Sequence, residues 1–125
     1  MRYVGCMKRL LVLSMLSLVF AAPVAAAPAA RSATILHISA SASGLKYSTT
    51  KLKAPAGKVS IVMKNLSPLM HDIAIKGNGV NAKGKIVGKG ATSTVTATLK
   101  KGSYTFYCSV DGHAAAGMKG TLTIS

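Results

Sequence analysis

The sequence predicts an all-β fold, an antiparallel sandwich or barrel of about seven to eight short strands. Ile, Val and Thr, which suit pleated and half-buried strands, are frequent in the chain. Stretches with a helical period are missing, and Gly, Ser, Asn and Pro recur at short intervals. Many short strands at this spacing are typical of sandwiches and barrels.

Eight strands are predicted in order, separated by turn residues. The strands are expected near residues 33–39, 46–50, 58–64, 72–76, 85–88, 93–99, 103–108 and 120–124. The strongest turn signals are the Gly- and Pro-containing segments 54–57, 65–68, 77–79 and 100–102. Residues 77–90 are rich in glycine and lysine, so we predict a surface excursion there with one short strand.

The amino terminus has the pattern of a secretory signal peptide. Arg2, Lys8 and Arg9 precede an apolar run over residues 10–22, which alanine and proline residues follow. The run is too short for a comfortable membrane span. We predict a signal peptide over residues 1–29, cut between residues 26 and 30, and one domain over residues 30–125. An uncleaved anchor helix is the alternative. The predicted location is the periplasm or the outer face of the membrane or cell wall.

Export makes the cysteine count informative. Cys6 precedes the apolar run and leaves with the signal peptide, so the mature chain keeps only Cys108. A lone thiol outside the cell is open to oxidation unless it is buried or bound to a metal. A buried structural cysteine is one interpretation. The residues that follow Cys108 favour a role as a metal ligand, because His113 comes five residues later and Met118 five residues after that.

Strand alternation places Cys108 at one end of the core. Tyr104, Phe106 and Cys108 share a face of the predicted strand, and the apolar Phe106 marks that face as the inner one. The following loop can then fold His113 and Met118 back toward Cys108. A cysteine and two histidines in a plane, with a weak axial methionine, are the ligands of blue-copper electron-transfer sites. A second histidine is therefore required.

Two other histidines are available. His71 stands at the entry to a predicted strand, after a proline-bearing loop, and so lies at an end of the sandwich. His37 lies within a strand without polar neighbours and is interpreted as a surface or packed residue. Met63 and Met70 compete with Met118 for the axial position, but Met63 is interpreted as core and Met70 as loop packing.

These residues resemble the cupredoxins, the small blue copper proteins that include plastocyanins, azurins, auracyanins and sulfocyanins. The resemblance covers nearly the whole mature chain and includes a histidine after an Asn…Pro loop. Its strongest part is the pattern Gly102-x-Tyr104-x-Phe106-x-Cys108-x4-His113-x4-Met118-x-Gly120. It implies a Greek-key sandwich with one type 1 copper per chain. His71, Cys108 and His113 would form the trigonal plane around copper, and Met118 would be the long axial ligand.

The resemblance also implies a hydrogen bond that orients the ligand loops. It would join Asp72, the residue after the first histidine, to Ser109, the residue after the cysteine. Many relatives have asparagine at the first of these positions and proline at the position of Asp111. An aspartate at position 72 adds negative charge near the metal, so we expect it to favour Cu(II) and lower the reduction potential.

The predicted function is electron transfer by Cu(II)/Cu(I) cycling, without enzymatic activity. Four ligands leave no open position for a substrate. The only acidic residues, Asp72 and Asp111, stand beside predicted ligands, and no acid–base machinery is visible. An extracytoplasmic copper chaperone or storage protein is the alternative function, and a metal-free binding sandwich is another. A zinc site would leave the thioether unused.

The charge of the chain bears on its partners. The net charge is +14, or +11 without Arg2, Lys8 and Arg9. The lysines are scattered, without an arginine-rich helix or an aromatic platform, so we predict no nucleic-acid partner. We expect a monomer that meets redox partners with an anionic docking surface, and electrostatic attraction to a membrane surface or cell wall. Pro68, Leu69 and Met70, with the alanines 114–116, are predicted to form an uncharged docking patch.

Overall fold

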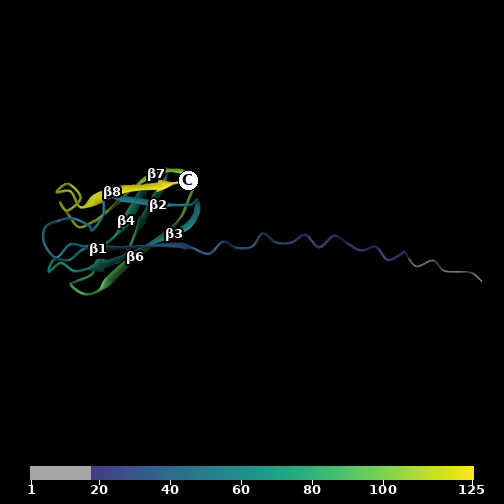
Figure 1. The fold of residues 1–125 in the computed structure, drawn as a ribbon, viewed down its shortest axis with the longest axis horizontal. Coiled ribbons are helices and arrows are strands. Elements are labelled where there is room, and N and C mark those ends of the chain that lie inside the picture. The colour runs from purple at the N-terminus through teal and green to yellow at the C-terminus, as the bar shows by residue number, and fades with distance from the viewer. Residues whose placement is uncertain (1–17) are drawn as a thin grey trace, which may run out of the picture.

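The computed structural model describes residues 18–125, in which eight strands form two sheets packed as a sandwich (Figure 1). The strands are β1 (Thr34–Ala40), β2 (Lys51–Ala54), β3 (Gly57–Asn65), β4 (Ala74–Gly77), β5 (Val80–Lys83), β6 (Thr92–Leu99), β7 (Gly102–Tyr107) and β8 (Lys119–Ile124). The all-β prediction is therefore confirmed.

Residues 18–33 form an extended segment that leaves the sandwich beside β1 (Figure 1). The predicted charged start of the signal peptide, Cys6 and the first part of the apolar run lie outside the described residues. Within residues 18–125, no helix is long and apolar enough to cross a membrane. The signal peptide over residues 1–29 and the domain boundary stay predictions.

The two sheets contain parallel as well as antiparallel pairs. One sheet has the strand order β1-β3-β6 and the other the order β2-β8-β7-β4-β5. The hairpin neighbours β4–β5 and β7–β8 are antiparallel, but β1 runs parallel to β3 and β2 parallel to β8. The expectation of a purely antiparallel sandwich is wrong for these two pairs. The chain changes sheets from β1 to β2 and again from β2 to β3, so these partners meet through crossings and not through hairpins.

Two predicted strands are wrong for the same reason. Residues 46–50 belong to the crossing from β1 to β2, and only the bridge between Ala40 and Tyr47 pairs there. Residues 85–88 belong to the crossing from β5 to β6, and only the bridge between His71 and Val87 pairs there. The short strand of the 77–90 excursion is β5, which directly follows the tight turn after β4. Periodicity does not show where a chain leaves one sheet for the other.

The core lies between the inner faces of the two sheets. Along β7 and just beyond it, Tyr104, Phe106 and Cys108 are 3%, 0% and 1% exposed, which confirms the predicted inner face. The opposing sheet contributes Ile61 and Met63 of β3, both fully buried. Burial of these side chains stabilises each by roughly 1.5–3 kcal/mol relative to exposure. The core therefore anchors the strand whose end bears Cys108.

Gly120 of β8 lies opposite Phe106 of β7 and leaves room for its ring. A Cβ atom at Gly120 would overlap with the Phe106 ring and would lie 2.5 Å from the carbonyl oxygen of Thr50. We expect Gly120→Ala to lower the free energy of unfolding by about 1–3 kcal/mol, because overpacking forces side chains and backbone to move. Urea denaturation measures this change. Gly88→Ala, which would meet only the Met70 sulfur at 3.5 Å, is the control and is expected to change the value by less than about 0.5 kcal/mol. Equal losses in both variants would contradict the packing argument.

Candidate metal centre

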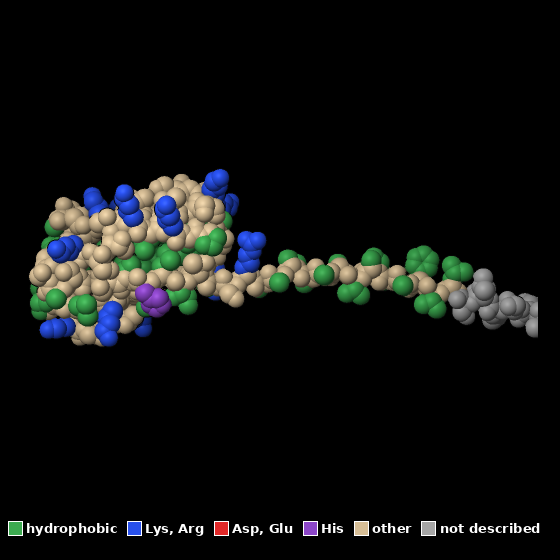
Figure 2. All heavy atoms as spheres, viewed as in Figure 1, with side chains coloured by type: hydrophobic (Ala, Val, Ile, Leu, Met, Phe, Trp, Pro, Cys, Tyr) green, Lys and Arg blue, Asp and Glu red, His purple; other side chains and the backbone are tan. Residues whose placement is uncertain are grey.

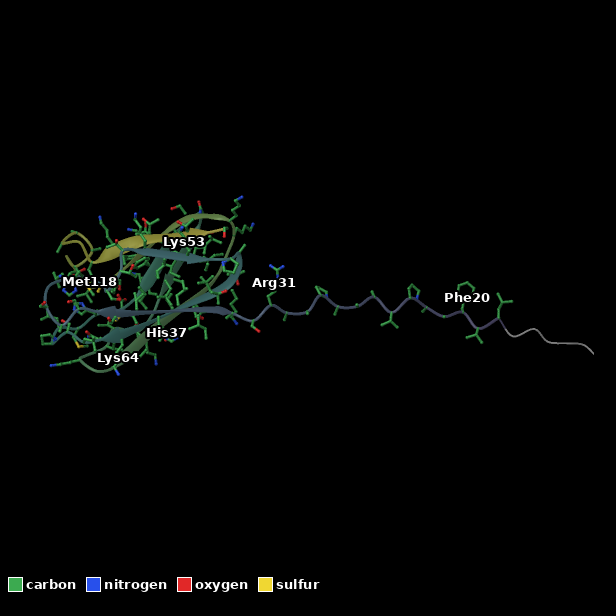
Figure 3. The ribbon with its side chains drawn as sticks, in the orientation of Figure 1. Phe20, Arg31, His37, Lys53, Lys64 and Met118 are labelled. Carbon is green, nitrogen blue, oxygen red and sulfur yellow. The ribbon has the colours of Figure 1, made fainter. Side chains whose placement is uncertain are left out.

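The predicted ligands come from two segments of the chain, the residues before β4 and the connection between β7 and β8, and these segments meet at one end of the sandwich. His71 stands before β4, at the bridge to Val87, and Cys108 directly follows β7. His113 lies in the loop between β7 and β8, and Met118 directly precedes β8. This end of the sandwich is opposite to the extended amino-terminal segment (Figures 1 and 3).

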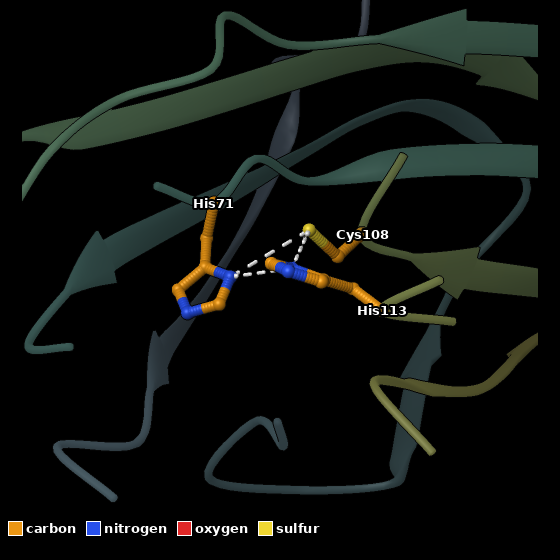
Figure 4. A group of neighbouring side chains, drawn as sticks. All are labelled: His71, Cys108 and His113. Atoms are coloured by element: carbon orange, nitrogen blue, oxygen red, sulfur yellow. Dashed lines mark hydrogen bonds between the residues drawn. The ribbon is translucent and has the colours of Figure 1, made fainter. Parts of the chain in front are cut away.

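Three donor atoms converge at this end (Figure 4). The Nδ1 atoms of His71 and His113 are 3.1 Å apart, and the Cys108 Sγ atom lies 3.8 Å and 3.6 Å from them. The point equidistant from the three atoms is about 2.0 Å from each, which is close to metal–nitrogen bond lengths and slightly short of metal–sulfur ones. The residues therefore fit one transition-metal ion in their plane.

His71 is held by its backbone and is fully buried. Its N–H group donates to the Val87 carbonyl at 3.1 Å, and its carbonyl accepts from the Val87 N–H group at 2.8 Å. Burial lowers the pKa of His71, and the neighbouring His113 lowers it further. Its Nε2 atom is buried and has no hydrogen-bond partner among residues 18–125. The lowered pKa of His71 favours the neutral imidazole, which is the form that binds a metal.

The Cys108 thiol is buried at the end of the core. Burial raises the pKa of this thiol, although hydrogen bonds to nearby backbone groups act in the opposite direction. Since the thiolate is the metal ligand, binding of a metal must release the proton that the metal-free thiol keeps. Cys108 is a free cysteine in the described part of the chain.

The loop from Cys108 to Met118 is closed by its own backbone. The Met118 N–H group donates to the His113 carbonyl at 3.0 Å, and the Cys108 N–H group donates to the Met118 carbonyl at 3.1 Å. Gly112 and Gly117, which precede His113 and Met118, have φ angles of 77° and 112°, where other residues are strained. The two glycines therefore allow the tight turns that return the His113 side chain and the Met118 backbone to Cys108.

The competing residues lie elsewhere. Met118, the last residue of this loop, is fully buried, whereas Met63 belongs to the β3 core. Met70 lies in a loop, as predicted, but its side chain is 52% exposed, so the prediction that it packs there is wrong. His37 is exposed on the edge strand β1, as expected.

A buried carboxylate joins the two ligand loops. Asp72 is 1% exposed and accepts a hydrogen bond of 2.6 Å from the Ser109 N–H group. Its second oxygen accepts a short hydrogen bond from the Ser109 hydroxyl group. Residues adjacent to His71 and Cys108 are thus tied together, in the pairing that the sequence resemblance implied.

Two supporting residues were not predicted. The Tyr47 hydroxyl group donates to the Asp72 carbonyl at 2.6 Å, its ring packs against Phe106, and burial raises its pKa well above the ordinary range. The Asn65 amide donates to the carbonyls of Leu69 and Val87 at 2.8 and 2.9 Å. The turn signal at residues 65–68, which begins with Asn65, indicated an ordered loop, but nothing near Tyr47 in the sequence indicated its contact with Asp72.

The fold and the site define the class: a cupredoxin-like sandwich with a type 1 copper centre. The chain matches the plastocyanin/azurin family of copper binding proteins over residues 34–125, and it belongs to that family. One copper site is formed by His71, Cys108, His113 and Met118. Proteins of this kind are electron carriers and not enzymes.

Solved auracyanin structures are similar to this chain. Auracyanin from the photosynthetic bacterium Roseiflexus castenholzii is 26% identical, with a TM-score of 0.67, over 74% of this chain and 97% of that one. Auracyanin B is 24% identical, with a TM-score of 0.66, over 82% and 93%. Auracyanin A, a blue copper protein from the green thermophilic photosynthetic bacterium Chloroflexus aurantiacus, is 24% identical, with a TM-score of 0.65, over 75% and 100%. No curated protein matches the sequence.

Proposed function

We propose that the mature protein is an exported carrier that shuttles single electrons between redox partners outside the cytoplasm. The observation that carries the electron-transfer part is the convergence of two imidazole nitrogens and one thiol within 3.8 Å of one another. The signal-like amino terminus supports export. Bound copper supplies a one-electron Cu(II)/Cu(I) couple, which soft sulfur and imidazole ligands together accommodate.

The protein's part is to keep the ligands in place. Val87 holds the backbone of His71, and the Met118 backbone holds that of Cys108. Asp72 and Ser109 lock the two loops to each other. A frame with this many hydrogen bonds changes little between oxidation states, so rearrangement does not slow electron transfer. We assign the long axial contact to Met118, because it is buried and ends the ligand loop.

His113 is the ligand through which we propose that electrons enter and leave. Its side chain is partly exposed, whereas His71 is fully buried. The neighbouring loops carry exposed apolar residues, which we call the apolar patch: Leu66, Pro68, Leu69, Met70, Ala115 and Ala116. Figure 2 shows apolar side chains at this end of the molecule. Such a patch suits brief docking of a redox partner.

The partners are proposed to present anionic surfaces. The mature chain has a net charge of +11, and one of its two acids, Asp72, is buried. Oppositely charged partners would be steered toward the protein at low ionic strength.

The rate of electron self-exchange tests the apolar patch. We expect Leu69→Lys to slow self-exchange at low salt about tenfold or more, because it puts a hydrated charge between two docking patches. NMR line widths in mixtures of reduced and oxidised protein measure this rate. The control is Thr98→Lys, which adds the same charge at an exposed position of β6. A similar loss in both variants would show that net charge, and not the patch, controls docking.

A further inference from the structure

The outer face of the five-stranded sheet carries lysines from four strands. Alternation along β7 turns Tyr104 and Phe106 inward and leaves Ser103, Thr105 and Tyr107 on the outer side. The register places the outward residues of the other strands beside them. We call this surface the basic face; its exposed lysines are Lys51, Lys53, Lys76, Lys83 and Lys119. Figure 2 shows lysine side chains along the side of the molecule that bears β2 and β8, and Figure 3 labels Lys53 there.

No acidic residue neutralises this face. The chain has two acids: Asp72 is buried at the metal centre, and Asp111 lies in the ligand loop. The positive charge of the five lysines is therefore not reduced by a neighbouring acidic side chain. This face is separate from the apolar patch, whose residues belong to the loops around His71 and His113.

The basic face also has a hollow of about 500 Å³. It is lined by Lys51, Lys76 and Lys119 together with Thr50, Thr105 and Thr121. Thr50 directly precedes β2, and Thr105 of β7 pairs with both Lys76 of β4 and Thr121 of β8 in the sheet register. Ammonium groups around hydroxyl donors form a surface on which the oxygens of a phosphate group can be both neutralised and hydrogen-bonded.

We propose that the basic face binds a linear, non-nucleotide polymer that carries phosphate groups along its backbone. One phosphate on exposed lysines would bind weakly, because each exposed ion pair contributes less than about 1 kcal/mol. A polymer engages several lysines at once and gains from the release of many counterions. Outward side chains two residues apart on a strand, such as Lys51 and Lys53, are roughly 7 Å apart at their bases, so flexible lysines can follow successive charges.

Other classes of partner fit this face less well. The cores of protein interfaces are depleted in lysine and enriched in aromatic residues and arginine. Here the folded domain has no arginine, and large exposed apolar residues lie elsewhere. A nucleic acid would lack a stacking platform, because the Lys76 ammonium group lies 4.6 Å from the centre of the Tyr107 ring and covers it. A flat bilayer would touch the lysine tips without filling the hollow.

The test is binding of the full mature protein to long-chain inorganic polyphosphate, measured by calorimetry at several salt concentrations. The variant K51Q/K76Q/K119Q removes the three lysines of the hollow. The matched control K46Q/K64Q/K89Q removes three exposed lysines that lie off the basic face. We expect the first variant to weaken binding tenfold or more and to flatten its salt dependence, and the control to weaken it less than threefold. Unchanged thermal unfolding of both variants shows that the fold is intact.

Several results would overturn the proposal. Equal weakening by both triple variants would mean that net charge alone attracts the polymer. Equally tight, face-dependent binding of polyglutamate would indicate an acidic protein partner. The same result with phosphatidylglycerol vesicles would indicate a membrane surface, and with duplex DNA a nucleic acid. Because the hollow lies outside the metal centre, none of these results depends on the proposed route of electron transfer.

Discussion

Replacing Cys108 with alanine is expected to remove essentially all of the intense visible absorption of the copper-loaded protein. In the wild-type protein, addition of Cu(II) should produce a strong blue or green band, and addition of ascorbate should bleach it. The band requires a thiolate bonded to Cu(II), and among residues 18–125 Cys108 supplies the only thiol beside the two histidine nitrogens. The measurement is a visible spectrum before and after each addition.

A Cys108→Ser variant is the matched control, because it keeps the size of the side chain and loses only the soft sulfur. We expect this variant to bind Cu(II) through His71 and His113 and to show only weak visible absorption. A wild-type protein that stays nearly colourless with Cu(II) would contradict a type 1 site. It would favour a Cu(I) chaperone or a protein that has kept only the fold.

Replacing Asp72 with asparagine is expected to raise the reduction potential of the copper centre. Asp72 is buried and sits next to His71, so its negative charge favours the more positive Cu(II) state. At an effective dielectric constant of about 20, a unit charge at a separation of about 8 Å changes the balance by roughly 2 kcal/mol. For one electron this corresponds to a rise of roughly 90 mV. Redox titration followed at the visible band measures the potential.

Ser109→Ala separates charge from loop geometry. This variant removes the hydroxyl donor to Asp72 and keeps the backbone N–H donor. The negative charge of the Asp72 carboxylate is then less well balanced by hydrogen-bond donors, so the reduction potential of Ser109→Ala should fall. The reduction potential of Asp72→Asn should rise. If both variants moved the potential in the same direction, the effect would come from loosened loops and not from the charge of Asp72.

Local patterns in the sequence were enough to predict much of the site. Cys108, His113 and Met118 stand within eleven consecutive residues, and alternation along β7 turns Cys108 toward the core. Short-range geometry of this kind depends on the strand period and on glycines that permit tight turns. The tight turn after β4 was predicted from its glycines for the same reason, but the strand that follows it was placed at residues 85–88, whereas β5 is Val80–Lys83.

Contacts between distant segments were not predictable in this way. The hydrogen bond from Tyr47 to Asp72 and the parallel pairs β1–β3 and β2–β8 arise where the chain crosses between sheets. The need for glycine at position 120 arises from the Phe106 ring, which lies opposite it on the neighbouring strand. The false strands at 46–50 and 85–88 lie in such crossings. The basic face, too, appears only when the register aligns lysines from four strands.

The sequence by itself determined the fold class, the identity of the donor atoms and the charge of the molecule, since strand periodicity and side-chain chemistry act over a few residues. The tertiary structure decided that the nitrogen of His71 lies 3.1 Å from that of His113, although 42 positions separate them. It did so because the antiparallel pairing of β4 with β7 within one sheet, and not any local preference, places the start of β4 beside the end of β7.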